Sequence, residues 1–300
     1  MKKKKTSPLI YIIVLNWNRK DDTKECLDSL QFLTYSNYKV VVVDNGSTDN
    51  SVEYLKKYFL SVKFIQNSSN LGFALGNNIG IKYALQEKAD YILILNNDTI
   101  VSATFLEKLI NVMTKDSTIA IAGPKILYHY RRNRIWFAGG KIYFWLGNTW
   151  HIGNKRKDSL NFQKIVEEDY QTGCALFIRA KVINKIGMFD SRYTAYFEDA
   201  DLCIRAKKMG FRVVCVQYAR IWHKISATTG GGLNPKKAYL KAESGVKFFR
   251  KNSPRLAYYS TAFVCAVCYI ILASIMEGLK GHQGVFKAFI KGLIKGIKDR

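Results

Sequence analysis

The sequence predicts an α/β fold with a mostly parallel sheet flanked by helices, and three observations carry this prediction. Short apolar runs rich in Ile and Val alternate with segments of helical character over the first hundred residues. These runs are continuously apolar, which is typical of strands covered on both faces. Turn-forming polar residues follow the runs directly. The resulting βαβαβαβ order favours parallel strands joined by crossover helices.

The residue types justify each element in order. Branched apolar residues predict four early strands, at 9–15, 39–43, 62–66 and 91–95. Helices are expected between them, at 21–30, 51–59 and 72–86, and Asp21-Asp22-Thr23 can cap the first of them. Three glycines at four-residue spacing, Gly72, Gly76 and Gly80, would let the third helix pack tightly on the sheet. Further along, we expect strands at 175–178 and 213–216 and a helix at 199–209, which acidic residues open and Gly210 ends.

The charge of the chain points to an anionic partner and is concentrated near its end. The 300 residues carry a formal net charge of +24. From residue 225 onward there are 13 Lys and Arg against 3 Asp and Glu, beside an uncharged stretch at 256–276 and a basic amphipathic pattern at 285–298. Basic residues next to apolar ones favour a membrane surface over nucleic acid. We therefore expect one α/β domain at 1–225 and a helical, membrane-associating segment at 226–300, which lies in the membrane interface rather than spanning it.

The first apolar run and the cysteines both indicate the cytosol. Met1 is followed by four lysines and then by an apolar run of seven residues, which is short for a signal peptide and lacks a small-residue cleavage site. We interpret this run as a buried strand. The six cysteines are scattered and mostly lie among apolar residues, so we expect buried thiols rather than disulfides or a zinc site.

Polar clusters follow three of the predicted strands. They are Asn16-Trp17-Asn18, Asp44-Asn45-Gly46 and Asn96-Asn97-Asp98. Ligands of parallel α/β sheets bind at the carboxyl ends of the strands. The Asp98 carboxylate at such an end can hold a hard divalent cation that bridges two phosphates. A simple strand-to-loop turn would also favour Asn and Asp, so this cluster alone does not decide between the two.

A second acidic cluster, Glu198-Asp199-Ala200-Asp201, begins the helix expected at 199–209. Three carboxylates within four positions raise each other's pKa values unless cations or a function offset this. A helix N-terminus lowers the cost, and Arg205 provides a local partner. A capped helix start and a catalytic cluster therefore both explain the motif.

Together, these segments resemble the inverting glycosyltransferase family 2, which has the GT-A fold, and within it the branch of rhamnosyltransferase-like and galactofuranosyltransferase-like enzymes. The resemblance covers about residues 8–225. It is carried by these motifs: Val14-Leu15-Asn16-Trp17-Asn18, Val43-Asp44-Asn45-Gly46-Ser47-Thr48-Asp49, Asn70-Leu71-Gly72-Phe73 with Gly76-Asn77-Asn78, Leu95-Asn96-Asn97-Asp98-Thr99, Thr172-Gly173, and Glu198-Asp199-Ala200-Asp201-Leu202-Cys203 with Arg205.

The resemblance implies a role for each motif. Asp44 would contact the nucleotide base, and the donor pocket would be completed by Asn16, Asn18, Asn45, Asn77, Asn78 and Asn97. Asp98 would bind Mg²⁺ or Mn²⁺ on the diphosphate, although Asn96 replaces the first Asp of the family's frequent Asp-x-Asp. His223, 24 residues after Asp199, is a candidate second metal ligand or a histidine that simply follows a strand. Asp199 would be the general base, with Glu198 beside it. The acceptor would contact Thr172, Gly173 and Asp201.

This resemblance implies transfer of a sugar, with inversion, from a UDP- or dTDP-sugar to a hydroxyl of a lipid-linked or glycan acceptor in cell-surface polysaccharide assembly. The enzyme would work at the cytoplasmic face of the cell membrane, bound to anionic lipid and not to nucleic acid. A cation neutralises the leaving diphosphate, and a base activates the hydroxyl. Two alternatives remain open: a polyprenyl-phosphate glycosyltransferase, whose phosphate nucleophile needs little base, and a non-enzymatic basic membrane-binding protein.

Overall fold

The computed structural model describes residues 7–225, 234–256, 268, 271, 275, 279 and 284–299. Its first half alternates strands and helices: β1 (Ile10–Asn16), α1 (Lys20–Leu30), β2 (Tyr38–Asp44), α2 (Ser51–Lys56), β3 (Lys63–Gln66), α3 (Gly72–Gln86), β4 (Tyr91–Asn96), β5 (Thr99–Val101) and α4 (Phe105–Lys115). The second half contains β6 (Ile119–Tyr128), β7 (Ile135–Phe137), β8 (Gly140–Tyr143), β9 (Asn148–His151), β10 (Ile165–Glu167), β11 (Ala175–Arg179), α5 (Ala180–Ile186), α6 (Glu198–Lys208), β12 (Arg212–His223), α7 (Pro235–Asn252) and α10 (Val285–Lys298).

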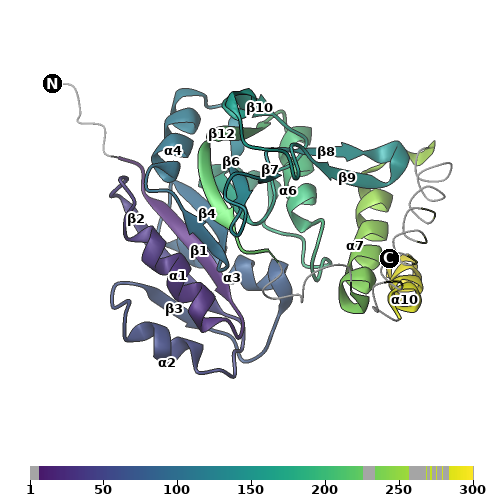
Figure 1. Cartoon of the computed structure of the whole chain (residues 1–300), viewed down its shortest axis with the longest axis horizontal. Helices are drawn as coiled ribbons and strands as arrows, with labels where there is room; N and C mark the ends of the chain where they lie inside the picture. Colours follow the sequence, from purple (N-terminus) through teal and green to yellow (C-terminus); the bar gives the residue numbers. More distant parts are fainter. Residues whose placement is uncertain are drawn as a thin grey trace.

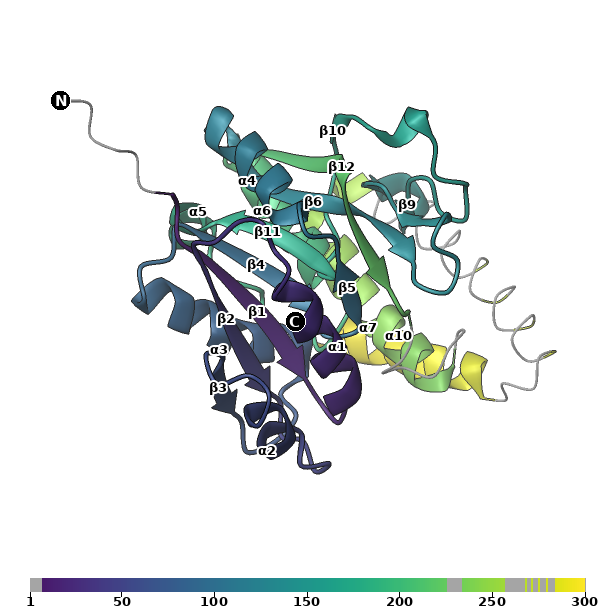
Figure 2. The same ribbon diagram turned by 60° about the vertical axis from the view of Figure 1, so that its left-hand side comes forward.

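The central sheet is mostly parallel, as predicted. Its strand order is β10-β12-β6-β11-β4-β1-β2-β3, while β5 pairs with β12 and β7 pairs with β6 (Figures 1 and 2). β1, β2, β3 and β4 are parallel to one another, and β6 is parallel to β12. β11 is antiparallel to both β4 and β6. The expected alternation therefore holds through β4, and β11 then enters between β4 and β6 in the opposite direction.

Helices cover the sheet on both faces. The chain moves from β1 to β2 to β3 and then returns to β4, so right-handed crossovers place α1 and α2 on one face and α3 on the other. Figure 1 shows α1 and α2 in front of these strands and α3 behind them. The glycines of α3 allow the expected close packing: a Cβ atom on Gly76 would lie 2.6 Å from the Leu15 side chain, and one on Gly80 would lie 2.5 Å from Ile13.

The described part of the segment after residue 225 packs on the rest of the molecule. α7 contacts the main core through Phe248 and Phe249. α10 has the predicted bounds, but its apolar residues are divided. Phe289 is buried against α7, whereas Phe286 and Ile294 remain about half exposed. A close approach of backbones makes this packing possible, because a Cβ atom on Gly296 would lie 2.7 Å from the carbonyl oxygen of Glu243.

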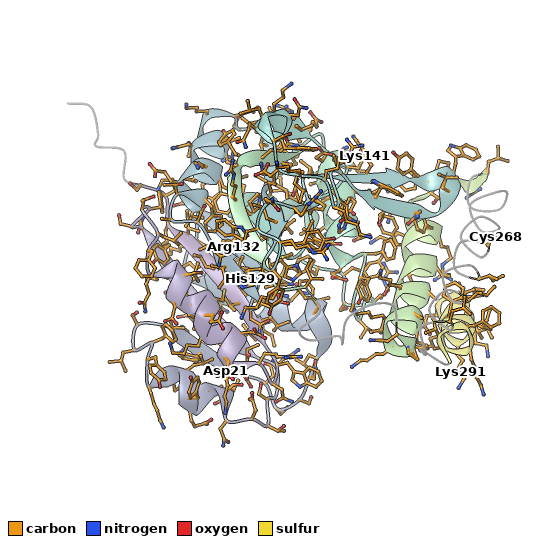
Figure 3. The ribbon with its side chains drawn as sticks, viewed as in Figure 1. Asp21, His129, Arg132, Lys141, Cys268 and Lys291 are labelled. Carbon is orange, nitrogen blue, oxygen red and sulfur yellow. The ribbon has the colours of Figure 1, made fainter. Side chains whose placement is uncertain are left out.

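The segment predicted to associate with a membrane lies only partly within the described residues. Among the described residues, no helix is long and apolar enough to cross a membrane. Most of the uncharged stretch at 256–276 lies outside the described residues. Figures 2 and 3 show that α10, which carries Lys291, lies beside α7 on the same side of the molecule as the β8–β9 hairpin, which carries Lys141.

The five described cysteines are free. Four of them, Cys26, Cys174, Cys203 and Cys215, are buried within the sheet and its helices, and Cys268 is exposed. Cys265 lies outside the described residues.

Candidate active site

The first polar cluster lies where β1, β2 and β4 end, as the sequence predicts. Asn16 is opposite Asp44 in the register of β1 and β2. Its amide donates a 2.8 Å hydrogen bond to Asp44 Oδ2, and its Oδ1 accepts a 2.7 Å bond from the Thr23 hydroxyl. The Asn97 amide donates to the same hydroxyl at 2.9 Å. Asn16 is fully buried. Asn16 therefore positions the side chains of Asp44 and Asn97 from inside the core and does not itself line a donor pocket.

Asp44 and Asn18 anchor the loop after β2. Asp44 is buried, and its Oδ1 accepts the backbone N–H of Ser47 at 2.9 Å. Asn18 has a positive φ of 51° and accepts the backbone N–H of Thr48 at 2.7 Å. A non-glycine residue in the left-handed region indicates that tertiary contacts fix the loop. Asp44, at the end of β2, and Asn18, in the loop after β1, therefore both hold the loop after β2 in place.

Three other asparagines predicted to line the donor pocket hold the scaffold together. Asn45 is buried and bonds to Asn67, Asn70 and the backbone of 71–72. Asn78 exchanges two hydrogen bonds with the backbone of Phe189, at 2.8 and 3.0 Å. Asn77 is fully buried and donates to the Phe73 carbonyl at 3.0 Å. The expectation that Asn45 and Asn78 bind donor does not fit these contacts, because neighbouring backbone and side-chain groups occupy the amide of Asn45 and backbone groups occupy that of Asn78.

The candidate metal centre pairs Asp98 with His223. β5 and β12 are antiparallel, and their register places His223 opposite Thr99, the residue after Asp98. His223 Nε2 lies 3.0 Å from Asp98 Oδ1, and both side chains are less than a tenth exposed. The ring of Trp136 packs edge-on against His223 at a centroid distance of 4.7 Å. A strand pairing that the sequence does not reveal therefore forms the pair.

Electrostatics make this pair ionic. Burial opposes the charged Asp98 carboxylate, but His223 and Lys224 outweigh it and lower the pKa of Asp98. Burial also opposes charge on the imidazole, yet Cys174 and Asp98 raise the pKa of His223 to about 10. In the absence of a bound cation, the imidazole is therefore protonated and neutralises the carboxylate.

The donor set fits Mg²⁺ or Mn²⁺. Asp98 Oδ1 is buried and accepts no well-aligned hydrogen bond, although it lies 3.0 Å from His223 Nε2. Two ligands at about 2.1 Å on neighbouring octahedral corners are about 3 Å apart, which matches this spacing. Within the described residues, no group of three His, Cys, Asp or Glu side chains could hold an ion. The protein thus offers two ligands, and diphosphate oxygens and water would have to complete the shell.

Asp199 and Glu198 begin α6, as the sequence predicts. Asp199 Oδ2 accepts the backbone N–H of Gly173 at 2.7 Å, and its Oδ1 accepts that of Ala200 at 2.7 Å. Glu198 is buried, and its Oε2 has no hydrogen-bond partner among the described residues. Burial raises the pKa of both carboxyls, and the charge of Asp199 raises that of Glu198 further. Two backbone donors stabilise a charge on Asp199, so the proton of the pair belongs on Glu198.

The backbone before this pair is strained. Tyr196 and Phe197 have φ values of 70° and 69°. Consecutive aromatic residues in the left-handed region are unfavourable and persist only where surrounding contacts enforce them. Such outliers gather at functional sites. The turn delivers Glu198 and Asp199 to the same region as the candidate metal pair.

The start of β11 joins the two acidic motifs. The backbone N–H of Asn96 donates to the Cys174 carbonyl at 2.9 Å. Burial raises the pKa of the Cys174 thiol, and the His223 imidazole opposes this rise. The Cys174 and His223 side chains therefore interact. Gly173, the neighbouring residue, holds Asp199. Asp98 and Asp199 therefore flank one short segment of backbone, which supports the prediction of a single site.

Of the residues predicted to contact the acceptor, only some lie at this site. Gly173 donates its backbone N–H to Asp199, and the Thr172 hydroxyl accepts the backbone N–H of Cys174. Asp201 does not face the site. Its carboxylate is fully buried and forms ion pairs with Arg205 at 2.8 Å and Lys251 at 2.7 Å. The i, i+4 pairing with Arg205 is the local partner that the sequence suggested. Asp201 therefore holds α6 to α7 and is not available to an acceptor.

Sequence reasoning missed several residues of this site. Trp136 and His151 come from β7 and β9, in the irregular middle of the chain, and their rings pack at 4.9 Å. Cys174 was expected to be only a buried thiol. The aromatic density of residues 128–150 was the available signal, but it did not indicate which rings turn toward the site.

Comparison with known proteins agrees with this geometry. Residues 11–187 match the model of the family described as glycosyl transferase family 2. The N-acetylglucosaminyl-diphospho-decaprenol L-rhamnosyltransferase of Mycobacterium tuberculosis is 24% identical over 239 residues, which cover 73% of this chain and 77% of that protein. The low-salt glycan biosynthesis hexosyltransferase Agl10 of Haloferax volcanii is 23% identical over 299 residues, or 96% and 91% of the two chains.

A solved structure shows the same fold. The mannosyltransferase PcManGT from Pyrobaculum calidifontis, in complex with GDP-Man and Mn²⁺, superposes with a TM-score of 0.62 over 99% of this chain and 89% of its own, at 14% identity. The likeness supports the GT-A fold inferred from the motifs. Since the family model spans more than half of the sequence, the chain belongs to glycosyl transferase family 2 and is a glycosyltransferase.

Proposed function

We propose that this enzyme transfers a sugar, with inversion, from a UDP- or dTDP-sugar to a hydroxyl of a lipid-linked or glycan acceptor in cell-surface polysaccharide assembly. The observation that carries the proposal is the arrangement of Asp98 and His223 on one side of Gly173-Cys174 and Asp199 on the other. A cation-binding pair and a carboxylate base at one site are what a one-step displacement of a nucleoside diphosphate needs.

Asp98 and His223 would hold Mg²⁺ or Mn²⁺, which supplies positive charge to the departing diphosphate when bound. Asp199 accepts the proton of the acceptor hydroxyl as its oxygen forms a bond to the anomeric carbon. The bond from that carbon to the diphosphate oxygen breaks, and the electron pair leaves with the nucleoside diphosphate. The backbone donors of Gly173 and Ala200 hold Asp199 in its basic form and fix its direction.

The relatives support the class of acceptor. The mycobacterial relative is named as an N-acetylglucosaminyl-diphospho-decaprenol rhamnosyltransferase, which fits a lipid-linked acceptor. We place the enzyme at the cytoplasmic face of the cell membrane, with basic helix α10 and its half-exposed Phe286 and Ile294 turned toward anionic lipid. We also propose residues 1–225 as the catalytic domain and 226–300 as the membrane-associating segment, with α7 shared between the two.

A donor panel tests the proposal. UDP- and dTDP-sugars are offered one at a time with Mn²⁺, and release of nucleoside diphosphate is measured with and without a lipid-linked sugar acceptor. We expect one donor to be consumed, with faster release when the acceptor is present. Absence of release from every donor, together with absence of donor signals in saturation-transfer NMR, would favour a non-enzymatic membrane-binding protein instead.

A further inference from the structure

Helix α7 lies beside the acidic motif that begins at Glu198. It belongs to residues 226–300, which the sequence predicted to be a membrane-associating segment. The Ser244 hydroxyl donates a 2.7 Å hydrogen bond to the Ala195 carbonyl, and the rings of Phe248 and Phe197 stack at a centroid distance of 5.1 Å. Positions 241, 244 and 248 share one face of a helix. Lys241 therefore lies on the face of α7 that covers the turn before Glu198.

Lys241 has an unusual environment for a lysine. Its side chain is accessible to solvent. Even so, enough protein surrounds the ammonium group that desolvation lowers its pKa. None of the described carboxylates forms an ion pair with it, and Nζ lies over the Tyr196 ring at 5.4 Å from the ring centroid. A partly desolvated ammonium without an anion gains most from an oxyanion ligand.

The charge of Lys241 also acts on the side of the site that carries the metal pair. Burial and then the charge of Lys241 lower the pKa of His151 to about 4. The His151 ring packs on Trp136, and Trp136 packs on His223. Lys241 thus lies between the turn that presents Asp199 and the aromatic rings that lead to His223.

The same helix carries a second lysine near the donor end. Lys236 Nζ lies 5.5 Å from the ring of Trp17, which follows Asn16 at the end of β1. The two lysines are therefore separated along α7, with Lys236 toward the proposed nucleotide loop and Lys241 toward the proposed base. This placement distinguishes Lys241 from a residue that serves the donor.

We propose that Lys241 binds a phosphate group of the acceptor, so that the acceptor class is a sugar carried on a lipid diphosphate. The inference rests on the proposed function, because it takes Asp199 as the group that receives the acceptor hydroxyl. With the sugar at Asp199, the linking diphosphate extends past Tyr196 toward α7, where the Lys241 ammonium forms a charge-assisted hydrogen bond to a phosphate oxygen. Lys241 is a binding residue and takes no proton in the reaction.

The test compares two diphosphate probes on the full-length protein with Mn²⁺. Geranyl diphosphate represents the acceptor diphosphate without its sugar, and UDP and dTDP represent the donor. Dissociation constants are measured by calorimetry for the wild type, Lys241→Met, Lys241→Arg and Lys82→Met. The last variant makes the same change at an exposed lysine of α3 and is the matched control. Unfolding temperatures of all four proteins show whether any variant is misfolded.

We expect Lys241→Met to weaken geranyl diphosphate binding about tenfold, the loss of one charge-assisted hydrogen bond, and to leave the nucleotides unaffected. Lys241→Arg should bind geranyl diphosphate within about threefold of the wild type, and Lys82→Met should change nothing. Unchanged binding of geranyl diphosphate in Lys241→Met, no binding to the wild type, or an equal loss for the nucleotide would each overturn the assignment. Wild-type protein that binds neither nucleotide and releases none from any donor would instead contradict the proposed function.

Discussion

Nε2 of His223 and Oδ1 of Asp98 lie 3.0 Å apart inside the protein, although the two residues are far apart in the sequence. The antiparallel pairing of β5 with β12 creates this contact. It explains how a chain with Asn96 in place of an acidic residue can still offer a cation two ligands.

The first prediction concerns this pair. His223→Ala and Asp98→Asn should each weaken Mn²⁺ binding by at least roughly tenfold in the presence of UDP, because each removes one of two protein ligands. Mn²⁺ titration followed by electron paramagnetic resonance measures the effect. His129→Ala is the control, since His129 lies close in the fold, with its backbone N–H bonded to the His223 carbonyl, but is not part of the pair. Equal losses in all three variants would argue against a site at Asp98.

The second prediction concerns the asparagines of α3. Asn78→Ala should lower the free energy of unfolding by about 2–4 kcal/mol, because it leaves the buried N–H and C=O of Phe189 without partners. Asn77→Ala should cost less, about 1 kcal/mol, since it removes one hydrogen bond. Urea unfolding measures both. The KM for donor should stay unchanged in Asn78→Ala; a large rise in KM without loss of stability would restore Asn78 to the donor pocket.

The strand ends and helices could be predicted because they depend on local residue types. The alternation of apolar runs and turn residues predicted α3 with the bounds that the structure has, and it placed Asp44, Asp98 and Asp199 at strand or helix ends. The basic amphipathic pattern at 285–298 predicted the bounds of α10. The reversal at β11 was not predictable in this way, because direction within a sheet depends on which strands meet and not on the residues of one strand.

Side-chain direction limited the prediction of the site. Asp201 and Asp199 belong to the same four-residue motif, yet the helix turns one toward Lys251 and the other toward Gly173. Asn16 and Asn78 are polar residues beside a candidate site, but buried backbone and side-chain partners use their amides. Lys241 lay in a segment whose composition indicated membrane association, and only the packing of α7 brings it to the acidic motif.

A third prediction follows from Glu168, which is fully buried with neither carboxyl oxygen hydrogen-bonded among the described residues. Burial raises the pKa of Glu168 from 4.5 to about 7 in the folded state. The folded protein therefore holds more protons than the unfolded chain between these values, so stability falls as pH rises through this window. Relative to Glu168→Gln, the wild type should lose roughly 3 kcal/mol between pH 4 and pH 8.

Urea unfolding at a series of pH values measures this difference. Glu167→Gln is the matched control, because the neighbouring side chain is exposed and pairs with Arg212 at the surface. If the free energy of unfolding of Glu168→Gln changes with pH in the same way as that of the wild type, Glu168 does not lose a proton in this window.

The fourth prediction assigns the proton of the acidic pair. At low pH, kcat/KM falls as the base becomes protonated, and this acid limb reports the pKa of the base. Because burial raises the pKa of Asp199, the pKa of the acid limb should lie above the usual carboxyl value near 4. Activity is then low below that pKa and rises with pH as the base becomes ionised. Glu198→Gln should keep this limb, since Glu198 already carries a proton. Loss of the limb in Glu198→Gln would make Glu198 the base.

The most direct measurement replaces the proposed base without changing its shape. Asp199→Asn keeps a side-chain oxygen that can accept the Gly173 N–H, but it cannot take a proton. Transfer to a hydroxyl acceptor should fall by roughly 10²–10⁴-fold, while the dissociation constant of the nucleoside diphosphate with Mn²⁺ stays within about twofold of the wild type. Both quantities are measured on the same preparation. Transfer at the wild-type rate by Asp199→Asn would contradict the account and would favour a phosphate nucleophile that needs no base.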